Sequence, residues 1–152
     1  MKNRTYHRLL PLVLVAFIIP SFFLIAGIVW AQAKTEKSKF TAVVTDSQGV
    51  ETELKHVIFY WEEKVSETSF VPHELVHMPV KQGTATVNVK FDRIKQIEVK
   101  PGANDGSPVF SITLTTGKTG DFTSAVKGSF KGETEFGEVE LPAGSLKKVA
   151  FK

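Results

Sequence analysis

TVNVKFDRIKQIEV (residues 86–99) and EVELPAGSLKKVAF (residues 138–151) are two copies of one pattern. Alignment without gaps places apolar residues at matching positions: Val87 with Val139, Val89 with Leu141, Ile94 with Leu146, Ile97 with Val149, and Val99 with Phe151. In each copy the apolar residues alternate in two short runs separated by a turn, which is typical of β-strands. Each copy therefore predicts one hairpin-type unit of two strands.

The repeat extends into two related halves of the chain. FTAVVTD (residues 40–46) matches FSITLTT (residues 110–116), and a glycine-containing turn follows each. Between the halves, KPGANDGSP (residues 100–108) has no large apolar residue and reads as a loop. The first half (40–99) exceeds the second (109–152) by about 18 residues, around positions 62–77. Residues 50–61 predict a long strand, and residues 62–68 a polar surface loop.

After residue 33, no window combines helical periodicity with helix caps, and turn signals separate about eight to ten short strands. Neither half is expected to bury its apolar face alone. We therefore expect an all-β fold, an antiparallel sandwich or small barrel of both halves, forming one domain over residues 40–152. Two tandem barrels are the alternative, but each would have a thin core. The spacing of the second copy resembles repeats of small exported bacterial proteins and is similar to an Sm-like or SH3-like meander.

The N-terminus predicts a secretory signal peptide over residues 1–33. Lys2, Arg4 and Arg8 precede an almost wholly apolar run, and Ala31-Gln32-Ala33 is a small-x-small cleavage site. The alternative is an uncleaved membrane anchor, because the run of about 22 residues is long enough to span a bilayer. We expect cleavage after Ala33, a flexible lead over residues 34–39, and export to the bacterial periplasm or cell exterior.

Charge and cysteine content narrow the classes of function. Without Lys2, Arg4 and Arg8, the chain keeps 16 basic and 16 acidic residues, so the exported part is formally neutral. It lacks the basic footprint of a nucleic-acid-binding protein. The chain has no cysteine, which excludes thiolate metal sites and a cysteine nucleophile. We expect no cofactor.

His73-Glu74-Leu75-Val76-His77 matches the H-E-x-x-H string of zinc peptidases. In those enzymes both histidines bind the metal and the glutamate acts as general base, which requires a helix so that both rings share one face. Pro72 and Pro79 flank the string, and its neighbours favour extended structure, in which the histidines lie about 13 Å apart. A zinc-dependent hydrolase that uses His73, Glu74 and His77 is therefore only the alternative. In the leading hypothesis, which is given next, no residue is catalytic.

The leading hypothesis is a non-enzymatic exported domain that acts as a binding or assembly module in the cell envelope. Its expected partner is another protein or envelope component, or a second copy joined through a sheet edge. The protein is expected to contact the membrane only through the N-terminal segment, if that segment is not cleaved. A further alternative is a small-ligand carrier with a cavity inside a barrel. The expected contact residues are Tyr60, Trp61, Phe70, His73 and His77.

Overall fold

The structure is a computed structural model that describes residues 37–102 and 108–152; the predicted signal peptide lies outside these residues. The described residues belong to one compact unit, Thr35–Lys152. The strands are β1 (Thr41–Asp46), β2 (Glu51–Lys64), β3 (Phe70–Leu75), β4 (His77–Gln82), β5 (Ala85–Lys90), β6 (Ile94–Lys100), β7 (Val109–Leu114), β8 (Thr119–Ser124), β9 (Ser129–Thr134), β10 (Gly137–Pro142) and β11 (Leu146–Phe151). Two short 3₁₀ helices, η1 (Phe91–Arg93) and η2 (Ala143–Ser145), precede β6 and β11. Within these residues no helix is long and apolar enough to cross a membrane.

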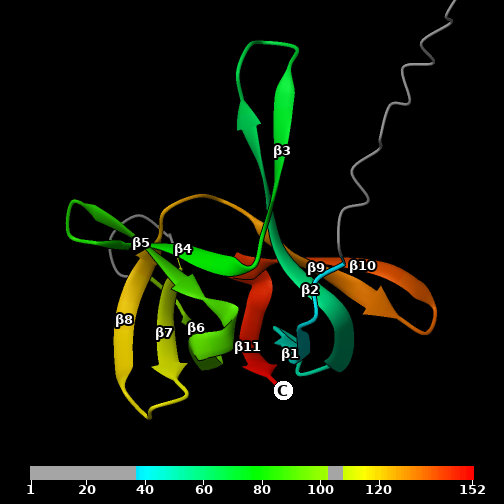
Figure 1. Cartoon of the computed structure of the whole chain (residues 1–152), viewed down its shortest axis with the longest axis vertical. Helices are drawn as coiled ribbons and strands as arrows, with labels where there is room; N and C mark the ends of the chain where they lie inside the picture. Colours follow the sequence, from blue (N-terminus) through cyan, green and yellow to red (C-terminus); the bar gives the residue numbers. More distant parts are fainter. Residues whose placement is uncertain (1–36, 103–107) are drawn as a thin grey trace, which may run out of the picture. The chain divides into compact units, whose positions relative to one another are not determined.

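All strands belong to one antiparallel sheet, shown in Figure 1. Its order is β10-β9-β2-β1-β11-β6-β7-β8-β4-β5, and β3 pairs with β2 outside this path. The predicted antiparallel all-β fold of two related halves is confirmed, and the described residues form eleven strands instead of the expected eight to ten. It is one continuous sheet rather than two stacked ones.

The sheet has pseudo-twofold symmetry. The first half supplies β1, β2, β4, β5 and β6, whose counterparts in the second half are β7, β8, β9, β10 and β11. Exchanging each strand for its counterpart reverses the strand order and leaves it otherwise unchanged. At the centre, β6 pairs with β11, and Ile97 lies opposite Val149. The β9–β10 hairpin of the second half joins β2 of the first, while β4–β5 joins β8, so the halves interlock.

The repeat is not a hairpin, contrary to the sequence-based prediction. In the first copy β5 pairs with β4, whereas β6 pairs with β11 and β7. The 3₁₀ helix between the two strands turns the chain out of the β4–β5 hairpin and into the middle of the sheet. The alternating pattern correctly predicted which residues face the core, but alternation carries no information about which strand lies alongside.

The alignment of the two halves was wrong by two residues at its start. Val44 opposes Val149 and Ile112 opposes Ile97, so Val44 and Ile112 are counterparts, and Phe40 does not correspond to Phe110. A slip of two positions preserves the face on which every side chain lies, so the apolar pattern could not reveal it.

The extra segment of the first half is an extension of β2 and the whole of β3. Lys55 and His77 of the first half correspond to Thr123 and Ser129 of the second. The first two residues are 22 positions apart in the sequence and the second two are six apart. The insertion therefore has 16 residues instead of about 18. The predicted loop over residues 62–68 is also wrong at its start, because β2 continues to Lys64 and pairs with β3.

Both halves contribute to one hydrophobic cluster, around which the sheet curls. Its largest fully buried side chains include Phe59, Phe91, Phe110 and Phe130. The symmetry does not extend to the size of these side chains: Phe91 begins η1, and its counterpart at the start of η2 is Ala143. Phe91 packs against Phe130 and Phe151. The cluster therefore joins residues from both halves in one core.

Candidate functional site

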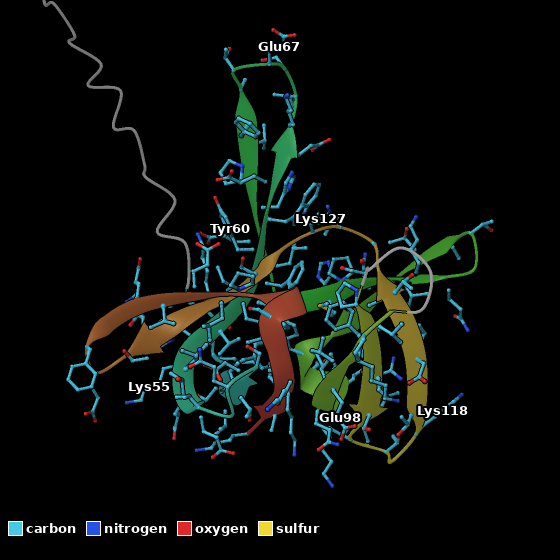
Figure 2. The ribbon with its side chains drawn as sticks, turned by 180° about the vertical axis from the view of Figure 1, so that it is seen from behind. Lys55, Tyr60, Glu67, Glu98, Lys118 and Lys127 are labelled. Carbon is cyan, nitrogen blue, oxygen red and sulfur yellow. The ribbon has the colours of Figure 1, made fainter. Side chains whose placement is uncertain are left out.

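Residues 60–74, which we call the arm, form a two-stranded ribbon that extends from the sheet (Figure 1). Pairing of β2 with β9 ends at Tyr60, and beyond that point β2 pairs with β3 alone. The loop closes with Val65 donating its N–H to the carbonyl of Ser69 at 3.1 Å. Figure 2 shows Tyr60 near the base of the arm and Glu67 at its tip.

One face of the arm carries an aromatic stack. Trp61 and His73 are directly opposite each other on β2 and β3, so their side chains share a face. Their rings stack with centroids 4.5 Å apart and an interplanar angle of 11°. Nε2 of His73 donates a hydrogen bond of 3.1 Å to Glu63 on the same face. The carboxylate and the indole thus fix the orientation of the imidazole.

The other face carries Tyr60, Glu74 and Phe70. Tyr60 pairs with Glu74, and Lys64 pairs with Phe70 nearer the tip. The Tyr60 hydroxyl donates a 2.5 Å hydrogen bond to Glu62, which raises the Tyr60 pKa to about 12. Nζ of Lys131 lies 3.2 Å from the centroid of the Tyr60 ring, a cation–π geometry. Phenol, carboxylate and ammonium groups thus meet at the base of this face.

Large apolar side chains of the arm are in contact with water. The exposed fractions are 56% for Val65, 53% for Phe70 and 40% for Val71. They lie on both faces, because Phe70 and Val71 are consecutive residues of β3 and their side chains alternate. A two-stranded ribbon with water on both sides is marginally stable by itself. The arm therefore has apolar surface that a partner can cover.

Four of the five predicted contact residues lie together at the arm, and the fifth does not. Trp61 and His73 are on one face, with Tyr60 and Phe70 on the other. His77 belongs to β4, is partly buried and lies opposite Lys90. Burial, followed by the charge of Lys90, lowers the His77 pKa. His77 is therefore separated from the Trp61–His73 stack by a change of strand.

The H-E-x-x-H string is extended, as its flanking prolines predicted. His73 and Glu74 are in β3, and His77 begins β4. Adjacent residues of a strand point to opposite faces, so Glu74 lies on the other side of the ribbon from His73. The helical geometry on which the zinc-hydrolase alternative depends is not formed by these residues. In the described parts of the chain, no three His, Asp or Glu side chains are arranged to hold a metal ion.

A groove of about 570 Å³ lies at the base of the arm. Its lining includes the partly buried side chain of Ile58 in β2 and Gly132 in β9, with Glu74 from the arm. Residues 37–38 also line it, and their position is fixed by two hydrogen bonds: Ser38 Oγ donates to the Val57 carbonyl at 2.7 Å, and His56 Nδ1 donates to the Ser38 carbonyl at 2.6 Å. In the expected flexible lead, residues 37–39 are therefore held in place, and residues 34–36 lie outside the described part of the chain.

Ion pairs neutralise part of the groove's acidic lining. Lys37 donates a 2.6 Å hydrogen bond to Glu133, which lowers the pKa of that carboxyl and raises the pKa of Lys37. Lys131 lies 3.0 Å from Glu140 and lowers its pKa in the same way. A second groove, of about 620 Å³, lies between the start of β2 and the β9–β10 hairpin and is lined in part by Phe136. Both grooves open to the surface, whereas the carrier alternative requires an enclosed interior cavity.

The sequence analysis did not predict the two grooves or the exposed apolar side chains of Val65 and Val71. It also did not predict the exposure of Phe136, which is 100% exposed at the turn of the β9–β10 hairpin. A groove formed by β2, β9 and β10 depends on pairing between residues more than seventy positions apart, such as Lys55 with Glu133, so no local pattern reports it. Val65 and Phe136 had a signal: each is a lone apolar residue within a polar, turn-forming segment.

Comparison with known proteins gives one match. No curated protein and no solved structure matches the chain. A protein-family model with the description "Uncharacterised protein" matches residues 36–152, which include every strand of the sheet and the arm. The chain belongs to the family that this model represents.

Proposed function

We propose that this protein is an exported, non-enzymatic binding or assembly module of the cell envelope, and that the arm is its contact with another protein. The observation that carries the proposal is the exposure of Val65, Phe70 and Val71 on a ribbon that extends from the sheet. The second half has no counterpart of this ribbon, because its chain passes from Thr123 to Ser129 directly. The arm is therefore an addition to a sheet that the rest of the repeat already completes.

The chemistry of the arm favours contact through its faces. Exposed aromatic and aliphatic groups next to charged groups are typical of the centre and rim of a protein interface. Phe70 and Val71 present apolar groups on opposite faces, and Glu63 and Lys64 place a charge beside each. A partner that encloses the ribbon, such as a cleft between two protein elements, would cover both faces at once.

Contact through the free edge of β3 is disfavoured by Pro72. Hydrogen-bonded and non-hydrogen-bonded residue pairs alternate along an antiparallel ladder, and Val65 with Ser69 is a hydrogen-bonded pair. Residues 63 and 71 are therefore hydrogen-bonded to each other within the arm, and residues 70, 72 and 74 direct their backbone N–H and C=O groups outward. Proline has no N–H, so Pro72 removes the donor in the middle of this free edge. A partner strand could not pair along the full length of β3.

The test is co-purification after chemical cross-linking in the native envelope. The variant replaces residues 62–72 with an Asn-Gly turn, which joins Trp61 to His73 and keeps the stack. We expect the wild-type protein to retain a discrete set of proteins that the truncated variant loses. Phe136→Ser, which removes an exposed aromatic group elsewhere, should retain the same set. Equal retention by the truncated variant would contradict the proposal.

A further inference from the structure

The two ends of the sheet, β5 and β10, each pair with one neighbour among the described residues. They are counterparts in the two halves and have the same pattern of burial. In Figure 1 the β4–β5 and β9–β10 hairpins lie on opposite sides of the sheet. Free edges of this kind are templates for the addition of another strand.

The two hairpins carry opposite charge, although they occupy equivalent positions. Residues 77–90 contain Lys81 and Lys90 and no acid. Residues 129–142 contain one basic residue, Lys131, and four acids: Glu133, Glu135, Glu138 and Glu140. With histidine neutral, the first hairpin is formally +2 and the second is formally −3. One edge of the sheet is therefore basic and the other acidic.

We propose that copies of this protein associate head to tail, with the free edge of β5 in one copy pairing antiparallel with the free edge of β10 in the next. The direction of the strands permits this arrangement. The main path has ten strands, and all its neighbours are antiparallel, so its first and last strands run in opposite directions. A second copy placed in the same orientation beside the first brings β10 against β5 in antiparallel fashion.

The backbone groups of the two edges are in register for this pairing. Phe91 donates its N–H to the Val76 carbonyl, and Ala143 does the same to Gly128. Hydrogen-bonded pairs recur at every second residue of an antiparallel ladder, so β5 is hydrogen-bonded to β4 through residues 89, 87 and 85, which precede Phe91 by two, four and six positions. Residues 86, 88 and 90 direct their backbone groups outward, away from β4. By the same count, residues 138, 140 and 142 of β10 point outward. The lack of an N–H at Pro142 falls at the end of the strand, where it interrupts the ladder least.

Side chains fit the same register. Placing Lys90 opposite Glu138 also places Asn88 opposite Glu140, and Val89 opposite Val139. Lys90, Glu138 and Glu140 are exposed, whereas Val89 and Val139 lie on the face that packs against the core. The shared sheet would therefore join apolar residues to apolar residues and an ammonium group to a carboxylate.

Pairing between like edges is less favourable. When two copies of β10 pair antiparallel around Val139, Glu138 of each lies opposite Glu140 of the other, and like charges across strands are destabilising. Two copies of β5 paired around Asn88 place Lys90 opposite Thr86, with no acid in reach on either strand. Because the favoured contact joins different surfaces, it does not end at a dimer and extends into larger assemblies.

Sedimentation velocity over a range of concentrations tests the proposal. The full-length sequence is expressed, and the protein is purified with whichever N-terminus the cells produce, cleaved or uncleaved. Circular dichroism is used to check that each variant is folded. We expect the wild-type protein to form dimers and larger species as concentration rises, and high salt to weaken them because the edge charges are exposed. Lys90→Glu and Glu138→Lys should each weaken association by about tenfold, and the double variant should restore it.

Two further variants separate this interface from others. Asn88→Pro removes an outward N–H without removing a bond to β4, so it should abolish association. Lys95→Glu makes the same charge change as Lys90→Glu on the exposed face of the central strand β6, and it should have no effect. A protein that stays monomeric overturns the proposal. So does association that the single charge reversals leave unchanged, or that the double variant fails to restore.

Discussion

Ile97 of β6 and Val149 of β11 occupy the same position in the two copies of the repeat and lie directly opposite each other. Both side chains are fully buried. Around this pair, Gln96 opposes Ala150 and Glu98 opposes Lys148, and each of these pairs maps onto the other when the copies are exchanged. The pseudo-twofold axis therefore passes between Ile97 and Val149, where the two halves meet.

Truncation at this axis should destabilise the whole protein. Ile97→Ala removes fully buried methyl groups and should cost about 2–5 kcal/mol of unfolding free energy. Val149→Ala should cost about 1.5–3 kcal/mol, since it removes a smaller side chain. Chemical denaturation of the single and double variants measures the coupling, which should differ from zero because the residues are in contact. Lys95→Ala, on the exposed face of β6, should stay within about 0.5 kcal/mol of wild type.

Gly132 should be intolerant of a side chain although its counterpart is a valine. Val80 occupies the matching position in β4 and is fully buried, but a Cβ at Gly132 would lie 2.9 Å from the Leu54 Cβ and 2.9 Å from the Lys55 carbonyl oxygen. Gly132→Ala should therefore cost about 1–3 kcal/mol of unfolding free energy. Gly144→Ala is the matched control, because its Cβ would meet only Pro108 at 3.4 Å. Similar thermal midpoints for both variants would contradict this packing.

These two sites illustrate what the sequence could and could not predict. Matching Ile97 with Val149 in the repeat correctly predicted an all-β fold of two related halves. Alternation shows which face a residue occupies, but it does not show that these two residues pair with each other. The sequence also could not predict that Val80 is tolerated where its counterpart must be Gly132. This difference arises because Leu54 and Lys55 of β2 lie close to Gly132 in β9.

The candidate site was predictable to a similar extent. Tyr60, Trp61, Phe70 and His73 were predicted as contact residues because they lie in or beside the segment that the first half has in addition to the second. Glu62, Glu63 and Lys64 suggested a polar loop, although pairing with β3 keeps them in a strand. Tertiary pairing here overrides local preference, since β propensity depends strongly on the neighbouring strand.

Tyr60 should ionise at an unusually high pH. The hydrogen bond to Glu62, then desolvation, and then the negative charges of Glu62, Glu140 and Glu74 together raise the pKa of Tyr60 to about 12. Since the folded state holds this proton more tightly than the unfolded chain, the contribution to stability is constant below pH of about 10 and declines between about 10 and 12. Ultraviolet titration of the phenol in the wild-type protein and in Glu62→Gln measures this. The substitution should lower the Tyr60 pKa, and an unchanged midpoint would contradict the hydrogen bond.

Shortening the arm should leave the fold intact. Residues 62–72 include no member of the buried core, and shortening a surface connection changes its closure entropy only slightly. The variant that joins Trp61 to His73 through Asn-Gly should therefore unfold at a similar temperature to wild type. Scanning calorimetry of both proteins provides the measurement. A large fall in the transition temperature would show that the arm stabilises the core, and loss of binding by this variant could not then be assigned to the contact surface.

The proposed export predicts a defined N-terminus. Cleavage after Ala33 leaves Lys34 as the first residue, two positions before the start of the family match at residue 36. Intact mass measurement of the protein purified from its native host should give the mass of residues 34–152. A mass that includes Met1 would contradict export by cleavage and support the anchored alternative.

Photo-cross-linking in living cells tests the role of the arm most directly. A photoreactive residue is placed at Phe70, which is 53% exposed on the arm, or at Lys95, on the exposed face of β6, and the adducts are compared after irradiation. We expect an adduct of discrete mass from position 70 and none of that mass from position 95. The absence of an adduct at position 70, or the same adducts from both positions, would contradict the assignment of the arm as the contact with a partner protein.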